Sequence, residues 1–318
     1  MRIFIVTPAG KGSRNGNRNT ALRWAHMLQS LHHKVTVDTA WNSQSTDLLL
    51  ALHARRSHAS IVRYRESYPA GRLVLALTGT DLYRDIKHDA DAQASMRLAD
   101  RMIVLQDQGR RELAADLRAK TRVIYQSAVA LVRTKPAVRS FEIAVIGHLR
   151  EEKDPFRAAL AARYLAASSR VQILHLGRAM SAEMEAEARR LMTEEPRYHW
   201  LGELPHWRVR RYLARVRALV ISSRMEGGAN VVSEALAAGV PVLASRISGN
   251  IGMLGQDYEG YYAVEDEHAL GALIAKFEFS ATFRRRLGSQ CNARKHLISA
   301  KRERAGLAAL VHELAHKE

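Results

Sequence analysis

The chain has 318 residues, which is enough for two domains of ordinary size, each with its own hydrophobic core. No apolar run approaches the roughly 18 residues that cross a bilayer, which excludes a membrane-spanning protein. The single cysteine excludes an internal disulfide, so we expect a cytoplasmic protein.

The positive charge of the chain is unevenly distributed. Residues 1–140 carry 23 Lys and Arg against 11 Asp and Glu, whereas residues 141–318 carry 26 against 21. An excess concentrated in one half suits a small anionic substrate as well as a polyanion. Because the sequence has no row of aromatic residues that would stack on bases, no nucleic-acid partner is predicted.

The first half of the sequence alternates short aliphatic or β-branched runs with helical patterns. A strand is predicted at 2–6 and an amphipathic helix at 19–32. Further strands are predicted at 34–38, 47–52, 72–77, 101–105 and 121–125, with helices near 55–67, 91–99 and 107–119. Strands that alternate with helices predict a parallel sheet covered on both faces.

A polar, basic segment with a proline at 131–140 is predicted to link two domains. The alternation then restarts, with strands at 141–147, 170–177, 198–202, 217–222, 240–245 and 260–266 and helices at 156–168, 181–193 and 206–216. The predicted fold is α/β, with two Rossmann-like doubly wound parallel-sheet domains facing across a cleft. We expect domains at 1–135 and 136–296, and a helix at 297–318 that crosses back to the first domain.

The segment SSRMEGGANVVSEALAAGVPVLAS places Glu226 before two glycines and Glu234 eight positions later in a helical pattern that stops at Gly239. Asn230 is a candidate cap for the start of this helix. Free N–H groups at a helix start bind anions, and glycines let a phosphate approach the backbone. We predict that the helix start binds a diphosphate, that Glu234 binds a ribose diol and that Glu226 contacts a hexose. The alternative is a capped helix with a salt-bridged glutamate.

This segment resembles the E-x7-E signature of retaining-type, GT-B-fold nucleotide-sugar glycosyltransferases, and the likeness covers most of residues 141–280. The stretch IGHLREEKDPF is similar to the family's G-R-L-x-x-x-K, whose arginine and lysine bind the donor diphosphate. Lys153 matches the lysine, His148 stands at the arginine position, and Arg150 follows two residues later. WLGELPHW would lie beside the nucleobase. The donor-binding residues that the likeness implies are His148, Arg150, Lys153, Gly202, Glu226, Gly227, Gly228, Ala229, Asn230, Val231 and Glu234.

Three loops of the first half follow predicted strands, so they reach the same carboxyl-end rim of the sheet. They are TPAGKGSRNGNRNTALRW, ALHARRS and LTGTDLYRD, and the first concentrates cations that suit a phosphate-like anion. Together the three loops resemble the selenosugar synthases of selenoneine biosynthesis over nearly the whole first domain. The predicted anion-binding residues are Lys11, Arg14, Asn17, Arg18, Thr20, Arg55 and Thr80.

The second resemblance implies a hexosyltransferase that joins selenophosphate to a UDP-sugar, either UDP-GlcNAc or UDP-glucose. A C–Se bond forms, UDP and phosphate leave, and a 1-seleno-sugar remains. The first domain would bind the acceptor and the second the nucleotide sugar. Candidate catalytic residues are Glu226, His53 and Asp81, although the anionic selenium needs no base. No cofactor or metal is predicted; the preferred hexose, the stereochemistry at C1 and the oligomeric state stay open.

Alternative interpretations also stay open. One alternative is a glycosyltransferase whose acceptor is an ordinary alcohol. Others are a protein that binds a sugar nucleotide without turnover and a protein that binds nucleic acid. A further alternative is an NAD-binding dehydrogenase with its dinucleotide site at GKGSRNG, 10–16, although this segment is one residue too long for G-x-G-x-x-G. The D-A-D at 89–91 is interpreted as helix-capping acids and not as a metal site. The segment HWRVRRYLARVRALV at 206–220 could touch anionic lipid but is interpreted as the solvated basic face of a helix.

Overall fold

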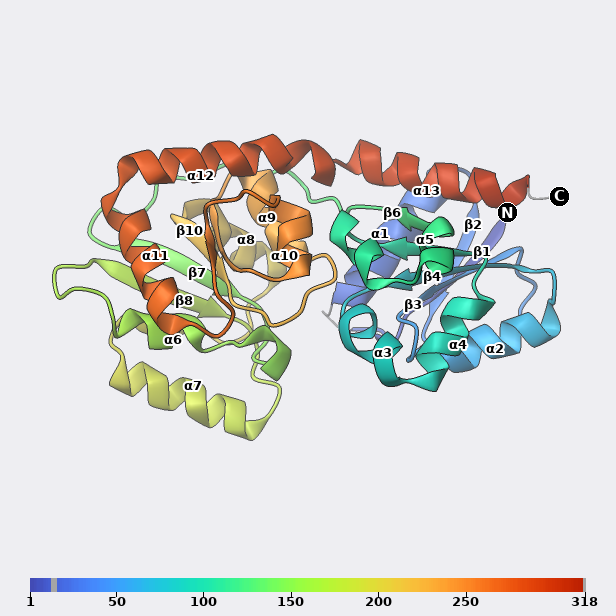
Figure 1. Ribbon diagram of the computed structural model, residues 1–318, viewed down its shortest axis with the longest axis horizontal. Coiled ribbons are helices and arrows are strands. Elements are labelled where there is room, and N and C mark those ends of the chain that lie inside the picture. The colour runs from blue at the N-terminus through green and yellow to red at the C-terminus, as the bar shows by residue number, and fades with distance from the viewer. Residues whose placement is uncertain (13–15, 317–318) are drawn as a thin grey trace. The chain divides into compact units, whose positions relative to one another are not determined.

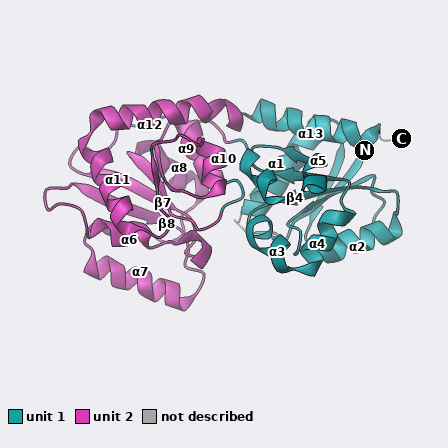
Figure 2. Cartoon of the chain, viewed as in Figure 1, with its two compact units in different colours: residues 1–127, 226–228, 299–318 teal, residues 128–225, 229–298 magenta. Residues whose placement is uncertain are grey.

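The computed structural model describes residues 1–12 and 16–316 (Figure 1). The chain divides into two compact units (Figure 2). The first comprises residues 1–127, 226–228 and 299–318, and the second comprises residues 128–225 and 229–298. Each unit contains one six-stranded parallel sheet, so the predicted α/β class with two doubly wound sheets is confirmed.

The sheet of the first unit has the strand order β2-β1-β3-β4-β5-β6. Its strands are β1 (Arg2–Val6), β2 (Lys34–Asp38), β3 (Leu48–Leu52), β4 (Arg72–Leu77), β5 (Arg101–Val104) and β6 (Thr121–Val123). Its helices are α1 (Gly16–Gln29), α2 (His58–Ser67), α3 (Ile86–His88), α4 (Ala90–Leu98), α5 (Ala115–Ala119) and α13 (Ala300–Ala315). The order reverses between β1 and β3, and ligands of such sheets bind at the carboxyl ends of the strands beside the reversal.

Both faces of this sheet are covered, which is why its inner strands read as continuous apolar runs, whereas the edge strand β2 alternates apolar and polar residues. Alternate residues of β1 serve the two faces: Phe4 and Val6 belong to one buried cluster, and Ile3 and Ile5 to the other. Side chains of α13, among them Leu310, complete the second cluster.

One carboxylate ties α13 to the rest of the first unit. Glu303 is 1 % exposed and accepts hydrogen bonds from Trp24 Nε1 at 2.7 Å, Arg23 Nε at 3.1 Å and the Ser127 N–H at 2.8 Å. A buried carboxylate is tolerated only when donors surround it in this way. The last helix of the chain is therefore part of the first unit's core.

The sheet of the second unit has the order β12-β11-β10-β7-β8-β9. Read from the other edge, this is the order 3-2-1-4-5-6 of dinucleotide-binding sheets. The strands are β7 (Phe141–Ile146), β8 (Val171–Leu176), β9 (Tyr198–Trp200), β10 (Ala218–Ile221), β11 (Val242–Ser245) and β12 (Tyr261–Tyr262). The helices are α6 (Arg157–Ala162), α7 (Ala182–Glu194), α8 (His206–Arg215), α9 (Asn230–Ala238), α10 (Ser248–Leu254), α11 (Glu267–Phe279) and α12 (Ala281–Arg294). The reversal falls between β7 and β10.

Two of the helix ends predicted from the sequence are confirmed by the structure, and one is not. Gly239 ends α9 with φ at +65°, and Asp89 caps α4 by accepting the Ala92 N–H, as predicted. The prediction that Asn230 caps α9 is wrong. Ala229 occupies the N-cap position without a side-chain hydrogen bond, and Asn230 is the first helical residue, because the chain turns one residue earlier than expected.

Candidate active site

In the second unit, the loops that follow β7 and β10 are joined to each other. The Ser222 hydroxyl donates to the carbonyls of Lys153 at 3.1 Å and Asp154 at 2.7 Å, and the Arg224 N–H donates to the Glu152 carbonyl at 2.9 Å. These bonds hold the loop that carries Lys153 against the carboxyl end of β10. The two loops therefore meet at the reversal of strand order, where a sheet of this type binds its ligand.

His148 lies on the same rim among three cations. Its Nδ1 accepts the backbone N–H of Arg178 at 3.1 Å, which orients the ring and leaves Nε2 as the donor. Burial lowers the pKa of His148, and the charges of Arg150, Arg178 and Lys153 lower it further, whereas Glu203 opposes them. A neutral imidazole donor surrounded by cations suits the oxygens of a diphosphate. Arg178 was not predicted from the sequence, where only its position directly after a strand would have marked it.

Gly177, another residue that was not predicted, connects three loops. Its N–H donates to the Gly202 carbonyl at 2.8 Å, and its own carbonyl accepts Trp200 Nε1 at 2.8 Å. Its φ is +159°, and a Cβ on this residue would lie 1.8 Å from the Gly147 carbonyl oxygen. Only glycine fits here, so Gly177 sets how the loop that carries His148 approaches the end of β8.

His175, on β8, supports the same loop from below. Its side chain is 1 % exposed, donates to the Gly147 carbonyl at 3.3 Å and pairs with the Tyr198 hydroxyl at 2.8 Å. Burial lowers the pKa of His175 to about 4. The ring is therefore neutral at physiological pH, and its contacts make it a positioning residue for the loop at Gly147.

We expect the free energy of unfolding to fall as the pH drops from about 6.5 to about 4, because the unfolded chain takes up a proton at His175 that the folded chain refuses. The loss for this one residue is roughly 3 kcal/mol at the acid end. Urea unfolding of the wild-type protein and of His175→Gln at pH 7 and pH 5 measures it. The variant should lose less stability between the two pH values; equal losses would contradict the assignment.

The residues predicted along α9 present one half-buried face. Asn230, Val231 and Glu234 are each partly exposed, whereas Ala229 is buried. Glu234 Oε1 lies 3.2 Å from His206 Nε2, and this hydrogen bond raises the pKa of His206. Glu234 thus has a salt-bridge partner, as the alternative of a capped helix with a salt-bridged glutamate required. Its side chain is nevertheless 23 % exposed, so a ligand can still reach it.

The rest of the predicted donor segment, Glu226–Gly228, belongs to the first unit. Glu226 is buried, at 8 % exposure. A Cβ on Gly227 would lie 2.2 Å from the Thr78 carbonyl oxygen, so this position also requires glycine. The predicted donor residues are therefore divided between the two units.

At the carboxyl end of β4, Asp81 organises the rim of the first sheet. The carboxylate is fully buried and accepts the backbone N–H groups of Ala54 at 3.0 Å, Thr78 at 2.9 Å and Gly79 at 2.8 Å. These three bonds join the loops after β3 and β4. These bonds make Asp81 a positioning residue for the two loops, and its charge also opposes the lowering of the pKa of His53 by burial. The catalytic role predicted for Asp81 stays a prediction.

Asp85 holds two arginines at the same rim. Its Oδ2 lies 3.3 Å from Arg55 Nε, and its Oδ1 accepts Arg84 Nε at 2.9 Å; the two guanidinium side chains are 44 % and 53 % exposed. His53 Nε2 lies 3.2 Å from Thr80 Oγ1 and 3.8 Å from Asp85 Oδ2, and burial lowers the pKa of His53. The result is a fixed pair of cations beside a neutral histidine, with Arg84 as a member that the sequence analysis did not single out.

The predicted anion-binding residues of the first loop differ in accessibility. Lys11 is exposed, and Asn17 and Arg18 are half-buried at the start of α1. Thr20 is buried: its hydroxyl donates to the Gly16 carbonyl and accepts from Gln126, which indicates a structural role. Arg14 lies outside the described residues, as does part of the segment 10–16 that resembles a dinucleotide site.

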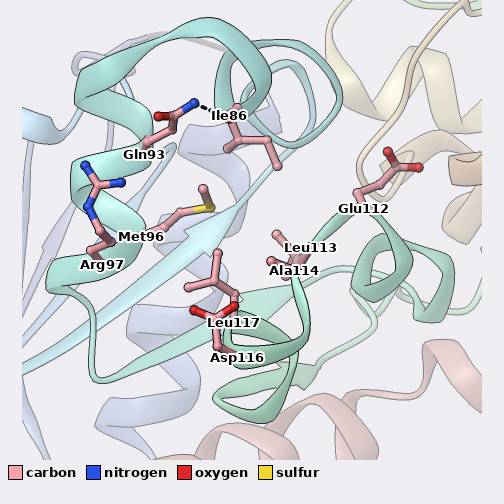
Figure 3. Close-up of a pocket in the computed structure, with 9 residues that line it drawn as sticks. All are labelled: Ile86, Gln93, Met96, Arg97, Glu112, Leu113, Ala114, Asp116 and Leu117. Atoms are coloured by element: carbon pink, nitrogen blue, oxygen red, sulfur yellow. Dashed lines mark hydrogen bonds between the residues drawn. The ribbon is translucent and has the colours of Figure 1, made fainter.

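A hollow of about 290 Å³ on the first unit lies elsewhere and holds none of the predicted site residues (Figure 3). Its lining combines apolar side chains with one cation, Arg97, and two carboxylates, Glu112 and Asp116. Such a lining does not suit an anionic substrate. The lining residues are Ile86, Gln93, Met96, Arg97, Glu112, Leu113, Ala114, Asp116 and Leu117.

Within residues 1–12 and 16–316, no group of three or more His, Cys, Asp or Glu side chains is placed to hold a metal ion. The prediction that no metal or cofactor is needed stays a prediction. In the same part of the chain, no helix combines the length and the apolar character needed to span a membrane.

Comparison with known proteins gives consistent matches. Residues 133–296, just over half of the chain, match the family model for "Glycosyl transferases group 1". The chain is 25 % identical over 292 residues to "Glycosyltransferase 1 domain-containing protein 1" of Xenopus tropicalis, covering 82 % of this chain and 83 % of that protein.

Solved structures show the same fold at low identity. HepE of Anabaena in complex with UDP and glucose has a TM-score of 0.75 at 15 % identity, covering 99 % of both chains. Sucrose-phosphate synthase of Thermosynechococcus elongatus has a TM-score of 0.77 at 17 % identity, covering 98 % of both chains.

Proposed function

Because the chain belongs to the group 1 glycosyl transferases and has the GT-B fold, we propose that it transfers a hexose from a UDP-sugar to selenophosphate. Binding of the UDP-sugar donor is supported above all by the cluster of Arg150, Lys153 and Arg178 around the neutral His148. This cluster lies at the strand-order reversal of the second unit. The solved complex of HepE with UDP and glucose supports a UDP-linked donor in this fold.

The donor is proposed to lie along this rim. The cations and the start of α9 bind the diphosphate, because a helix start offers free N–H groups and a positive dipole end. Glu234 accepts hydrogen bonds from the ribose hydroxyls, and Glu226 contacts the hexose. The same positive charge stabilises UDP as it leaves.

The acceptor is proposed to bind the rim of the first unit. Arg55 and Arg84 are about half exposed and are held in place by the buried Asp85, so their guanidinium groups are preorganised for an anion with several charges. The exposed Lys11 adds a further cation. Selenophosphate is a small anion with more than one charge, and this is the chemistry that such a rim recognises.

The glycosyl-transfer step of the proposed reaction needs no base, and in the later hydrolysis the proton of the attacking water passes to selenium or stays on the phosphate. The selenium of selenophosphate attacks C1 of the hexose, and the bond from C1 to the UDP oxygen breaks with its electron pair passing to UDP. Water then attacks phosphorus and breaks the P–Se bond, which gives phosphate and a 1-seleno-sugar. Selenium is already anionic, so the side chains bind and orient the reactants and stabilise the departing charge.

Incubation of the protein with selenophosphate and either UDP-GlcNAc or UDP-glucose should release UDP and form a 1-seleno-sugar that mass spectrometry detects. The same donors with simple alcohols test the other acceptor class. If UDP is released only when an alcohol is present and no seleno-sugar forms, the proposed acceptor is wrong and the proposed UDP-sugar donor is retained. If no acceptor releases UDP from either donor, the proposed function is wrong. The anomeric coupling of the product in NMR reports the stereochemistry.

Replacing Glu234 with alanine is expected to weaken UDP binding by roughly 10- to 100-fold, because a charge-assisted hydrogen bond to the ribose is lost. Isothermal titration calorimetry measures the dissociation constant. His206→Ala is the matched control: it removes the histidine that hydrogen-bonds Glu234 and leaves the carboxylate, so UDP affinity should be kept. An unchanged affinity in Glu234→Ala would place the ribose elsewhere.

A further inference from the structure

The second unit carries a basic surface that begins beside the proposed donor site, where His206 hydrogen-bonds Glu234, and extends away from it. We call it the α8–linker surface and define it as residues 128–140 and 206–217. It contains eight Lys and Arg residues and no Asp or Glu. Both segments belong to the second unit, so the surface exists within one compact body.

Hydrogen bonds lay the linker along α8. Arg210 Nη2 donates to the Ala130 carbonyl at 3.0 Å, and one helical turn further the Thr134 N–H donates to the Ala214 carbonyl at 3.0 Å. The contacts run in the same direction along both segments. The linker is therefore a fixed part of this face, and its side chains and those of α8 form one surface.

Four large apolar side chains of this surface point into solvent. Val129 is 75 % exposed, Val132 and Val138 are each 85 % exposed, and Trp207 is 58 % exposed. The guanidinium groups of Arg208 and Arg211 each lie 5.9 Å from the centre of the Trp207 ring. Isolated exposed apolar residues need no explanation, but four of them on two adjoining segments that carry eight cations mark a candidate interaction site.

The cations of the surface divide into two sets. Arg133, Arg210 and Arg217 donate to backbone carbonyls, and Arg215 pairs with Glu142, so these four hold the structure together. The other four, Lys135, Arg139, Arg208 and Arg211, are exposed beside the valines and the tryptophan. They are the charges that a partner would meet.

We propose that the α8–linker surface binds the anionic surface of a membrane. Exposed cations attract anionic headgroups, and a tryptophan with neighbouring aliphatic side chains inserts at the boundary between headgroups and acyl chains. Nucleic acid would use the cations but not the three valines, which offer no ring for a base to stack on. The sequence analysis expected a solvated basic face here, and the valines that the linker adds are the observation that changes the interpretation.

Sedimentation with lipid vesicles tests this proposal. The wild-type protein should sediment with vesicles that combine phosphatidylcholine and phosphatidylglycerol, much less with phosphatidylcholine alone, and less as NaCl rises. The double variants Arg208→Glu/Arg211→Glu and Val129→Ser/Val132→Ser should each lower the partition coefficient at least about tenfold. None of these residues belongs to the proposed donor or acceptor sites, so UDP binding should be retained.

Arg285→Glu and Phe279→Ser are the controls, because both residues are exposed on the second unit outside this surface. They should bind vesicles like the wild type, and circular dichroism should show that all variants are folded. Equal binding to neutral and anionic vesicles, or unchanged binding of both double variants, would overturn the proposal. So would tight binding to a labelled oligonucleotide with no vesicle binding.

Discussion

Replacing Gly177 with alanine is expected to reduce kcat/KM for the UDP-sugar by roughly 100-fold. The new Cβ would lie 1.8 Å from the Gly147 carbonyl oxygen, and the backbone there has no flexible side chain that could yield. The loop that carries His148 must then shift, and the cations around it no longer match the diphosphate. Steady-state kinetics with varied UDP-sugar should show the loss chiefly as a raised KM.

Gly288→Ala is the matched control for this substitution. Gly288 lies in α12, and a Cβ there would meet nothing within 4 Å, so kcat/KM should stay at the wild-type value. Calorimetric titration with UDP shows whether a loss of kcat/KM in Gly177→Ala comes from weaker binding of UDP or from another effect of the substitution. A variant that binds UDP with wild-type affinity would show that the loop at Gly147 does not hold the diphosphate.

Replacing Asp81 with alanine is expected to lower the free energy of unfolding of the first unit by more than about 3 kcal/mol. Three backbone N–H groups, the buried ones of Ala54 and Gly79 and the half-buried one of Thr78, lose their carboxylate acceptor. Urea unfolding followed by fluorescence measures the effect.

Asp89→Ala provides the comparison, because Asp89 accepts a single N–H at the exposed start of α4. Its loss should cost about 1 kcal/mol, the ordinary value for an N-cap. If Asp81→Ala instead unfolds like the wild type and loses all turnover, then the carboxylate acts on the reactants and the catalytic role first predicted for it is correct.

The fold was predictable because its determinants are local. Runs of apolar residues separated by helical patterns specify parallel strands with covered faces. The ends of the observed strands lie within one or two residues of those predicted, except that β12 ends four residues earlier. Gly239 and Asp89 ended and began their helices as expected, because the conformation of a cap depends on a few neighbouring residues.

The candidate site was predictable only in part. Lys153 and Glu234 stand in motifs with recognisable spacing, and the three candidate acceptor loops of the first half follow strands. The pattern gave no sign that Asp81 would face three backbone N–H groups, or that Arg84 would share Asp85 with Arg55. Those contacts arise when separate loops meet at one rim of the sheet. The hydrophobic periodicity of a single segment does not indicate which other loops it will contact.

The sequence by itself determined two doubly wound sheets, the paired-glutamate helix and the excess of positive charge in the first half. Only the tertiary structure decided that Gly177 abuts Gly147, that the linker lies along α8 and that Glu303 binds Trp24, 279 residues away in the chain. The physical reason is one of range. Strand and helix patterns repeat every two to four residues and are encoded locally, whereas these contacts depend on which crossover brings two distant segments to the same edge of a sheet.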